Sequence, residues 1–285
     1  MQLDRALSSY SADHGVLITV NLDAEYAARA FVPDLAVGEG TPFKIMGRDG
    51  METGLARLLE VLHRFQVKAT FFVPGKVVET YPEAMQMIVA QGHEIGCRGY
   101  ENENLALYSP SEQREIIFRG RQAVERVCQV TPQGFRAPAG ELTAETLHIV
   151  KELKFTYSSS LYNDDIPYVH CWKDGGRLLE IPIHTALYDL PYFIFHFDPP
   201  IPAGQSRIAC SEDVLTNWKW EYIGCRRYGA CYVLQLDPQI IGTQGRIYML
   251  EELLEFIRSQ GDAWITTGAE LVNVLSNREF FSCTR

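Results

Sequence analysis

The chain has 285 residues, of which 46% are hydrophobic and 11% aromatic, so it is long enough to bury a sizeable core in one large domain. Its 26 basic and 36 acidic residues give a formal net charge of −10. Because no basic stripe offsets this charge, nucleic acid and anionic membrane surfaces are excluded as expected partners.

The start of the chain and the cysteines predict the compartment. The first fifteen residues include Asp4, Arg5, Asp13 and His14 and contain no apolar segment typical of a secretory signal. No stretch reaches the roughly 18 apolar residues of a membrane-spanning helix. The seven cysteines are scattered, and none is spaced C-x-x-C. These features predict a soluble cytoplasmic protein with free buried thiols, without a disulfide framework or a structural zinc site.

Apolar runs of strand length alternate with segments of helical period. The first strand is predicted at 15–22 (GVLITVNL), and the first helix at 51–65, where four leucines share one face. The elements that follow are a strand at 67–73, a helix at 81–90, a strand at 93–97, a helix at 110–127, a strand at 134–136, a helix at 144–153, strands at 155–158 and 178–183, a helix at 211–227, a strand at 230–236, a helix at 245–258, a strand at 263–266 and a helix from Gly268.

This alternation predicts an α/β fold with a mostly parallel sheet covered by helices, in one domain spanning residues 1–285. The number of strand–helix units favours a barrel over an open sheet. Two long segments, at about 24–50 and 189–210, interrupt the pattern and are predicted to be irregular. Ligands bind at the carboxyl ends of parallel strands, where such segments gather, so both are expected to border a pocket.

A series of short motifs carries a family resemblance. They are KATFFVP at 68–74, YPE at 81–83, GHEIG at 92–96, GFRAP at 134–138, DDIPY at 164–168, EIP at 180–182, DLPYF at 189–193, PQIIG at 238–242 and GRI at 245–247. Together they resemble the polysaccharide-deacetylase (NodB-homology) superfamily. They are most similar to the branch that contains cyclic-imide hydrolases, metal-independent allantoinases and a peptidoglycan-deacetylase-like group. The resemblance implies that family's distorted (β/α) barrel, with the site at the strand ends.

The resemblance also implies a mechanism whose parts can be matched to this sequence. In the family, a carboxylate and two histidines hold a divalent metal, a second aspartate is the base, and a late histidine is the acid. The family's D-x-D reads Asn21-Leu22-Asp23 here, so the ligand carboxylate is present and the base is an amide. Arg98 and Asn102 stand at the two histidine positions, and Asp237 stands at the position of the acid histidine.

These substitutions argue against an ordinary metal-dependent glycan deacetylase. A guanidinium is not a metal ligand and repels a divalent cation, and the amide of Asn21 cannot act as a base at neutral pH. We therefore predict no metal and no cofactor. If the fold is correct, Asn21, Asp23, Arg98, Asn102, Arg136 and Asp237 converge on one pocket.

Two interpretations of that pocket remain open. In the first, the two arginines and two aspartates form an ion-pair network that fills the space left by the metal, because buried charges are normally paired. In the second, the site is rebuilt for catalysis: Arg98 and Arg136 bind a substrate carboxylate or a developing oxyanion, and Asp23 or Asp237 moves a proton. Asn21 and Asn102 would then contact the substrate.

Other candidates each have an ordinary structural alternative. His184 could be an acid–base group near the pocket, while Glu25 and Asp189 could bind substrate or be exposed loop carboxylates. Cys97, beside Arg98, could be a nucleophile, but a buried thiol is the favoured interpretation. The aromatic residues at 218, 220 and 222 are predicted to be core rather than a sugar-binding platform.

The function predicted from these residues is a metal-independent enzyme acting on a small polar molecule at a C–N or carbonyl centre. Hydrolysis of an amide or cyclic imide, or ring opening or closing, fits best, with a carboxylate-bearing substrate as one option. The alternative is a non-catalytic deacetylase-like protein that binds a ligand or a partner. The sequence leaves homo-oligomerisation open.

Overall fold

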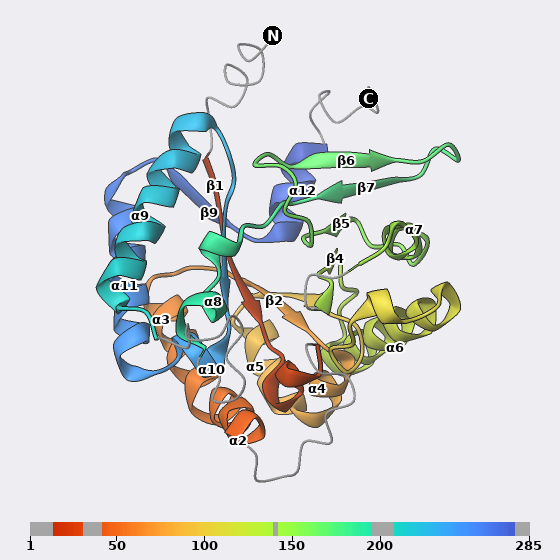
Figure 1. Ribbon diagram of the computed structural model, residues 1–285, viewed down its shortest axis with the longest axis horizontal. Helices are drawn as coiled ribbons and strands as arrows, with labels where there is room; N and C mark the ends of the chain where they lie inside the picture. Colours follow the sequence, from red (N-terminus) through yellow and green to blue (C-terminus); the bar gives the residue numbers. More distant parts are fainter. Residues whose placement is uncertain (1–13, 31–41, 139–141, 195–207, 277–285) are drawn as a thin grey trace.

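A curled, nine-stranded sheet forms the centre of the computed structural model, which describes residues 14–30, 42–138, 142–194 and 208–276 (Figure 1). The strands are β1 (His14–Asn21), β2 (Thr70–Val73), β3 (Glu94–Cys97), β4 (Gly134–Phe135), β5 (Tyr157–Ser158), β6 (Tyr168–Cys171), β7 (Arg177–Glu180), β8 (Tyr232–Leu236) and β9 (Ala263–Thr266). Their order is β6-β7-β5-β4-β3-β2-β1-β8, and β9 also pairs with β1. Every pairing is parallel except that of β6 with β7. The predicted distorted barrel in a single α/β domain is confirmed.

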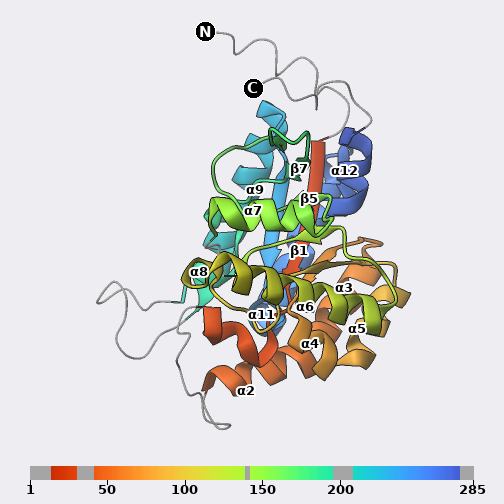
Figure 2. The same ribbon diagram turned by 90° about the vertical axis from the view of Figure 1, so that its right-hand side faces the viewer.

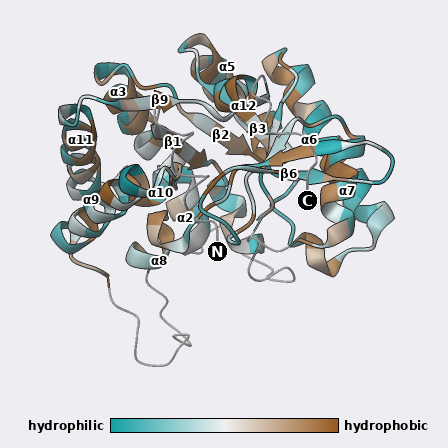
Figure 3. Cartoon of the chain, turned by 90° about the horizontal axis from the view of Figure 1, so that it is seen from above, coloured by the Kyte–Doolittle hydropathy of each residue, from teal (hydrophilic) through white to brown (hydrophobic). Residues whose placement is uncertain are grey.

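Helices surround the sheet, as Figure 3 shows from above. They are α2 (Pro42–Asp49), α3 (Leu55–Arg64), α4 (Gly75–Thr80), α5 (Pro82–Ala90), α6 (Pro110–Cys128), α7 (Ala144–Glu152), α8 (Leu190–Phe193), α9 (Ser211–Tyr228), α10 (Pro238–Ile241), α11 (Gln244–Ser259) and α12 (Gly268–Ser276). Figure 2 shows α6 and α7 lying over one side of the sheet. No helix in the described ranges is long and apolar enough to cross a membrane.

Local sequence explains where the elements begin and end. The apolar run of β1 is buried along its described length, as a central parallel strand covered on both faces must be. Helix α6 begins at a capping box formed by Ser109 and Glu112, with Pro110 in the first turn. Helix α9 ends at Gly229, whose φ of 68° is the left-handed conformation that glycine adopts without strain.

The sequence missed several short elements. Part of the segment 24–50, predicted to be irregular, contains a 3₁₀ helix at Ala24–Ala30 and helix α2. A π-helical turn at Gly50–Gly54 precedes α3. A Cβ atom at Gly54 would lie 2.2 Å from the carbonyl oxygen of Pro238, so glycine is required for this turn to pack against the segment after β8. Helices α4, α8 and α10 and strand β6 were also not predicted.

The cysteine prediction needs one correction. Cys97 and Cys128 are buried free thiols, as expected, and Cys210, Cys225 and Cys231 are also free but less buried. Cys171, in contrast, is disulfide-bonded. The prediction of free thiols is therefore wrong for Cys171, and it no longer supports a reducing compartment.

The parallel arrangement decides where the site lies. Strands β1, β3, β4 and β8 end at Asn21, Cys97, Phe135 and Leu236. Because parallel strands end at the same edge of a sheet, the residues that follow them are brought together there.

Candidate active site

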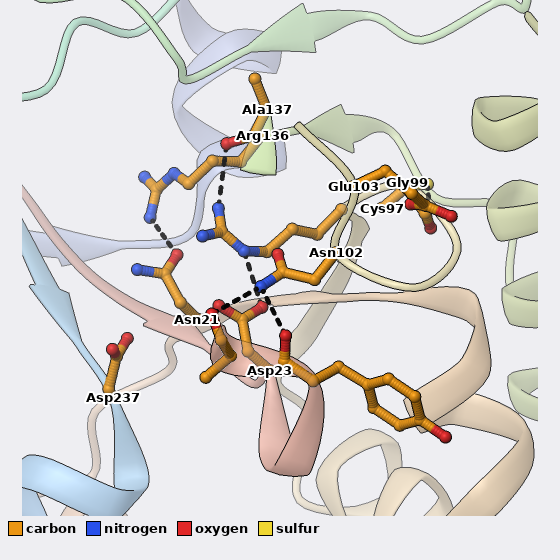
Figure 4. A network of polar contacts seen from close by, with 12 residues as sticks. Asn21, Asp23, Cys97, Gly99, Asn102, Glu103, Arg136, Ala137 and Asp237 are labelled. Carbon is orange, nitrogen blue, oxygen red and sulfur yellow. Dashed lines mark hydrogen bonds and ion pairs between the residues drawn. The ribbon is translucent and has the colours of Figure 1, made fainter. Parts of the chain in front are cut away.

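Six polar residues converge at this edge of the sheet, as the sequence predicted. They are Asn21, Asp23, Arg98, Asn102, Arg136 and Asp237, and all six are buried. Figure 4 shows where Asn21, Asp23, Asn102, Arg136 and Asp237 lie at this edge.

The most direct contact is a buried ion pair between Arg98 and Asp23. Arg98 donates from Nε to Asp23 Oδ1 at 2.7 Å, and the two side chains are 7% and 5% exposed. Nη1 of Arg98 donates to the carbonyl oxygen of Ala137 at 3.1 Å. Burial acts to lower the pKa of Arg98, but Asp23, Tyr188 and Asp237 together outweigh it, and the net shift is upward. Arg98 is therefore a fixed cation within the site.

Asn102 anchors the segment that follows Asp23. Its backbone has a φ of 64°, a left-handed conformation that asparagine tolerates better than most residues. Its Nδ2 donates to the carbonyl oxygens of Tyr26 at 3.3 Å and Ala27 at 3.5 Å. Its Oδ1 is buried and has no hydrogen-bond partner. An unpaired buried acceptor costs free energy, so this atom is a candidate contact for a bound ligand.

The second arginine, Arg136, uses its guanidinium for contacts within the protein. Nε and Nη2 donate to the carbonyl and hydroxyl oxygens of Ser159, each at 2.8 Å. Nη1 donates to Thr19 Oγ1 at 2.8 Å and Asn21 Oδ1 at 3.2 Å, and the guanidinium lies 4.2 Å from the ring centroid of Phe72. Burial, together with the charge of Arg98, lowers the pKa of Arg136 to about 9. Arg136 thus orients Asn21 and Ser159, and its catalytic role stays a prediction.

Glu180, at the end of β7, holds in place the backbone to which both arginines are bonded. The sequence did not reveal this role. Its fully buried carboxylate accepts from the backbone N–H of Ser160 at 2.6 Å and of Leu161 at 2.9 Å. Ser160 Oγ in turn accepts from the N–H of Ala137, whose carbonyl receives Arg98. A buried carboxylate therefore fixes the backbone to which the guanidinium groups are bonded.

The acidic part of the site is formed by Asp237, Tyr188 and Asp189. The hydroxyl of Tyr188 lies 3.1 and 3.3 Å from the two carboxylate oxygens of Asp237, to which it donates. Asp189 Oδ2 accepts from the backbone N–H of Asp237 at 2.9 Å, and Asp189 Oδ1 is buried without a partner. Neither aspartate forms an ion pair with any described residue. Two buried carboxyl groups that lie near each other disfavour double ionisation.

The protonation of this acidic part follows from burial. Burial, followed by the charge of Asp23, raises the pKa of Asp237 to about 7. Burial and the nearby Asp237 raise the pKa of Asp189 well above its ordinary value. The pKa of the Tyr188 hydroxyl is also raised well above its ordinary value by burial and by Asp237, so Tyr188 is a hydrogen-bond donor at neutral pH. Asp237 is consequently a group in the site that can exchange a proton near neutrality.

The remaining candidates are held by other contacts. His184 forms an ion pair with Asp165 at 3.1 Å when protonated, and Glu25 accepts from the hydroxyl of Tyr81 at 2.9 Å. The substrate-binding roles of His184, Glu25 and Asp189 stay predictions. Cys97 is fully buried, and this burial raises the pKa of its thiol to about 12. The structural interpretation of Cys97 as a buried apolar residue is confirmed.

Comparison with known proteins identifies the family. The polysaccharide deacetylase family model matches residues 48–158. A solved structure of a putative polysaccharide deacetylase from Mycobacterium smegmatis is 30% identical and has a TM-score of 0.85, and the match covers 95% of this chain and 93% of that one. The chain belongs to the polysaccharide deacetylase family.

Two further proteins match most of the chain. A peptidoglycan deacetylase from Helicobacter pylori is 27% identical over 256 residues, which cover 80% of this chain and 86% of that protein. The structure of the allantoinase PuuE is 18% identical with a TM-score of 0.81 and covers 94% of this chain and 92% of that one. At this level of identity, the likeness to PuuE shows a shared fold.

The polysaccharide deacetylase family implies a divalent metal, but the residues present here do not fit one. The guanidinium of Arg98 lies against Asp23, the one matching ligand carboxylate, and would repel a divalent cation. Nδ2 of Asn102 is engaged by backbone carbonyls. Within the described residues, no group of three histidine, cysteine, aspartate or glutamate side chains could hold a metal ion. The donor set therefore differs from any ordinary zinc site.

We expect the purified wild-type protein to carry no stoichiometric zinc, cobalt or nickel, because Arg98 fills the position beside Asp23. The double substitution Arg98→His/Asn102→His should gain about one equivalent of zinc, since it supplies two imidazoles next to a carboxylate. Elemental analysis after dialysis measures both proteins. One equivalent of metal in the wild type, lost on Asp23→Ala, would overturn this interpretation.

Proposed function

We propose that this polysaccharide deacetylase family member is a metal-independent enzyme acting on a small polar molecule at a C–N or carbonyl centre. The reaction class is hydrolysis of an amide or cyclic imide, or opening or closing of a ring. Relatives named deacetylase and allantoinase support this class.

The observation that carries the proposal is that Asp237 is buried without an ion-pair partner among the described residues. A buried carboxyl group with no ion-pair partner among the described residues lowers stability, and fold requirements alone do not explain it. Its pKa of about 7 matches that of a general acid–base group working at neutral pH. The single hydroxyl hydrogen of Tyr188 is shared between the two carboxylate oxygens and so helps to hold the Asp237 carboxyl group in place.

Arg98 provides the complementary electrophilic group. Its Nε and Nη1 are bonded within the protein, whereas Nη2 forms no hydrogen bond with the described residues. In a desolvated site, an N–H donor on a fixed cation stabilises an oxyanion or a substrate carboxylate. Asp237 and Arg98 together supply the two functions that hydrolysis at a carbonyl centre requires: proton transfer and stabilisation of developing negative charge.

One observation favours the non-catalytic alternative. The Arg98–Asp23 pair is nearly closed to solvent, and Arg136 is fully engaged within the protein. A site in which every charge is paired would have a structural role and no catalytic one. The unpaired Asp237 is the reason we prefer the catalytic proposal.

The test is a panel of five- and six-membered cyclic amides, imides and ureides together with their ring-opened acids. We expect turnover of at least one compound, at a rate that excess chelator does not change. Liquid chromatography measures the rate. N-acetylglucosamine oligomers should release no acetate. The same compounds are screened by thermal shift: stabilisation without turnover would support the binding protein, and the absence of both effects would reject the catalytic proposal.

A further inference from the structure

The outer face of helix α9 carries an apolar surface that the site does not use. The sequence predicted that Trp218, Trp220 and Tyr222 are core residues, and Trp218 and Tyr222 are indeed fully buried. Trp220 is not: it is 67% exposed, and Ile223 on the same side of the helix is 39% exposed. Figure 1 shows α9 at the outer edge of the molecule beside α11. A largely exposed tryptophan next to an exposed isoleucine is typical of a protein interface.

The residues around Trp220 form a continuous strip along α9. Positions 213, 216, 220, 224 and 227 are spaced by three or four residues and therefore lie on one side of the helix. At Gly224 the space where a side chain would begin has no neighbouring atom within 4 Å. A glycine at this point allows another helix to approach closely.

The charges on this strip are arranged symmetrically about Trp220. Asp213 lies seven residues before Trp220 and Arg227 seven residues after it, a distance of about 10 Å along the helix in each direction. Neither forms an ion pair with the rest of the described chain, whereas the adjacent Arg226 is paired with Asp262 at 2.7 Å. The strip thus presents one unpaired charge of each sign at equal distances from its apolar centre.

We propose that α9 packs antiparallel against α9 of a second copy of this chain, about a twofold axis at Trp220. In this arrangement Asp213 of each copy faces Arg227 of the other, Thr216 faces Gly224, and the two Trp220 side chains meet at the axis. Such a surface is complementary to itself, as a twofold interface requires. The proposal is independent of the catalytic function.

The experiment measures the mass of the full chain by sedimentation over a range of concentrations. We expect a dimer that Asp213→Arg or Arg227→Asp weakens by about tenfold or more, because like charges then face each other. The double charge swap should restore the wild-type dissociation constant to within about threefold, since it exchanges the two signs without changing the pairing. Trp220→Ala should weaken the dimer strongly, and Tyr248→Ala, at an exposed tyrosine of α11, serves as the matched control.

A second measurement checks the register. Thr216→Cys/Gly224→Cys should form an interchain disulfide under mild oxidation, whereas each single cysteine variant should not, because equivalent positions lie eight residues apart across the axis. A monomer at all concentrations, or a dimer that responds to neither the single nor the double charge swap, would overturn the proposal.

Discussion

Replacing Arg98 with methionine is expected to lower the free energy of unfolding by roughly 3–5 kcal/mol, because it leaves the buried carboxylate of Asp23 without its counterion. Methionine retains most of the apolar stem, so packing is changed little. The double variant Arg98→Met/Asp23→Asn should recover part of the loss, since an amide carries no charge to be neutralised. Denaturant unfolding of the two single variants and the double variant measures the coupling.

Arg114→Met is the matched control for this experiment. Arg114 forms an ion pair with Glu152 at the surface, where the side chains are 50% and 41% exposed, and exposed pairs contribute about 0–1 kcal/mol. If Arg98→Met lowered the free energy of unfolding as little as Arg114→Met does, the buried pair would not be important for the stability of the site. Arg98 would then act mainly toward a ligand, the second interpretation that the sequence left open.

Asp237→Asn is expected to reduce turnover of the substrate found in the panel by roughly 10²- to 10⁴-fold, because an amide cannot exchange a proton. The same change should make the folded protein more stable than the wild type at high pH, where the buried wild-type carboxyl group is ionised. The pKa of Asp237 is raised from 3.8 to about 7 in the folded protein, so the folded state binds the proton more tightly than the unfolded chain. Wild-type stability should therefore fall as pH rises from about 4 to about 7, by at most ~1.4 kcal/mol per pH unit from this group.

In Asp237→Asn this decline should be smaller, and the variant should gain stability relative to wild type between pH 4 and pH 8. Asp189, whose pKa is also raised, leaves a residual slope. Thermal unfolding across this pH range measures the effect, and Asp49→Asn, at an exposed carboxylate, is the control. Equal pH slopes in wild type and Asp237→Asn would show that Asp237 is ionised throughout, and would remove the basis for its acid–base role.

Much of the fold could be predicted because its signals are local. The run at 15–22 and the helical faces of α3, α6 and α11 repeat apolar residues at the period of their element, and parallel order follows from strand–helix alternation. Short elements were missed because four to six residues are too few to show a period, as in α4 and α8. Strand β6 exists because it pairs with β7, a contact that no local pattern encodes.

The sequence also predicted which polar residues meet, since each follows a strand that ends at the same edge. It could not predict how their hydrogen bonds are distributed. Arg136 binds Ser159, which lies 23 positions away along the chain, and Tyr188 reaches Asp237 because its backbone pairs with Gln235 of β8. The balance of charge was predicted incompletely: Arg98 pairs with Asp23, whereas Arg136 and Asp237 have no charged partner among the described residues.

The positive charge beside Asp23 belongs to the polypeptide itself. A cation attached through a covalent side chain cannot be exchanged for a competing ion, and its presence does not depend on the supply of zinc in the surroundings. Sites that bind a free metal ion, in contrast, select among several ions by availability as well as by affinity. The site of this protein is charged as soon as the chain has folded, and under the proposed function no metal ion has to be acquired at this position.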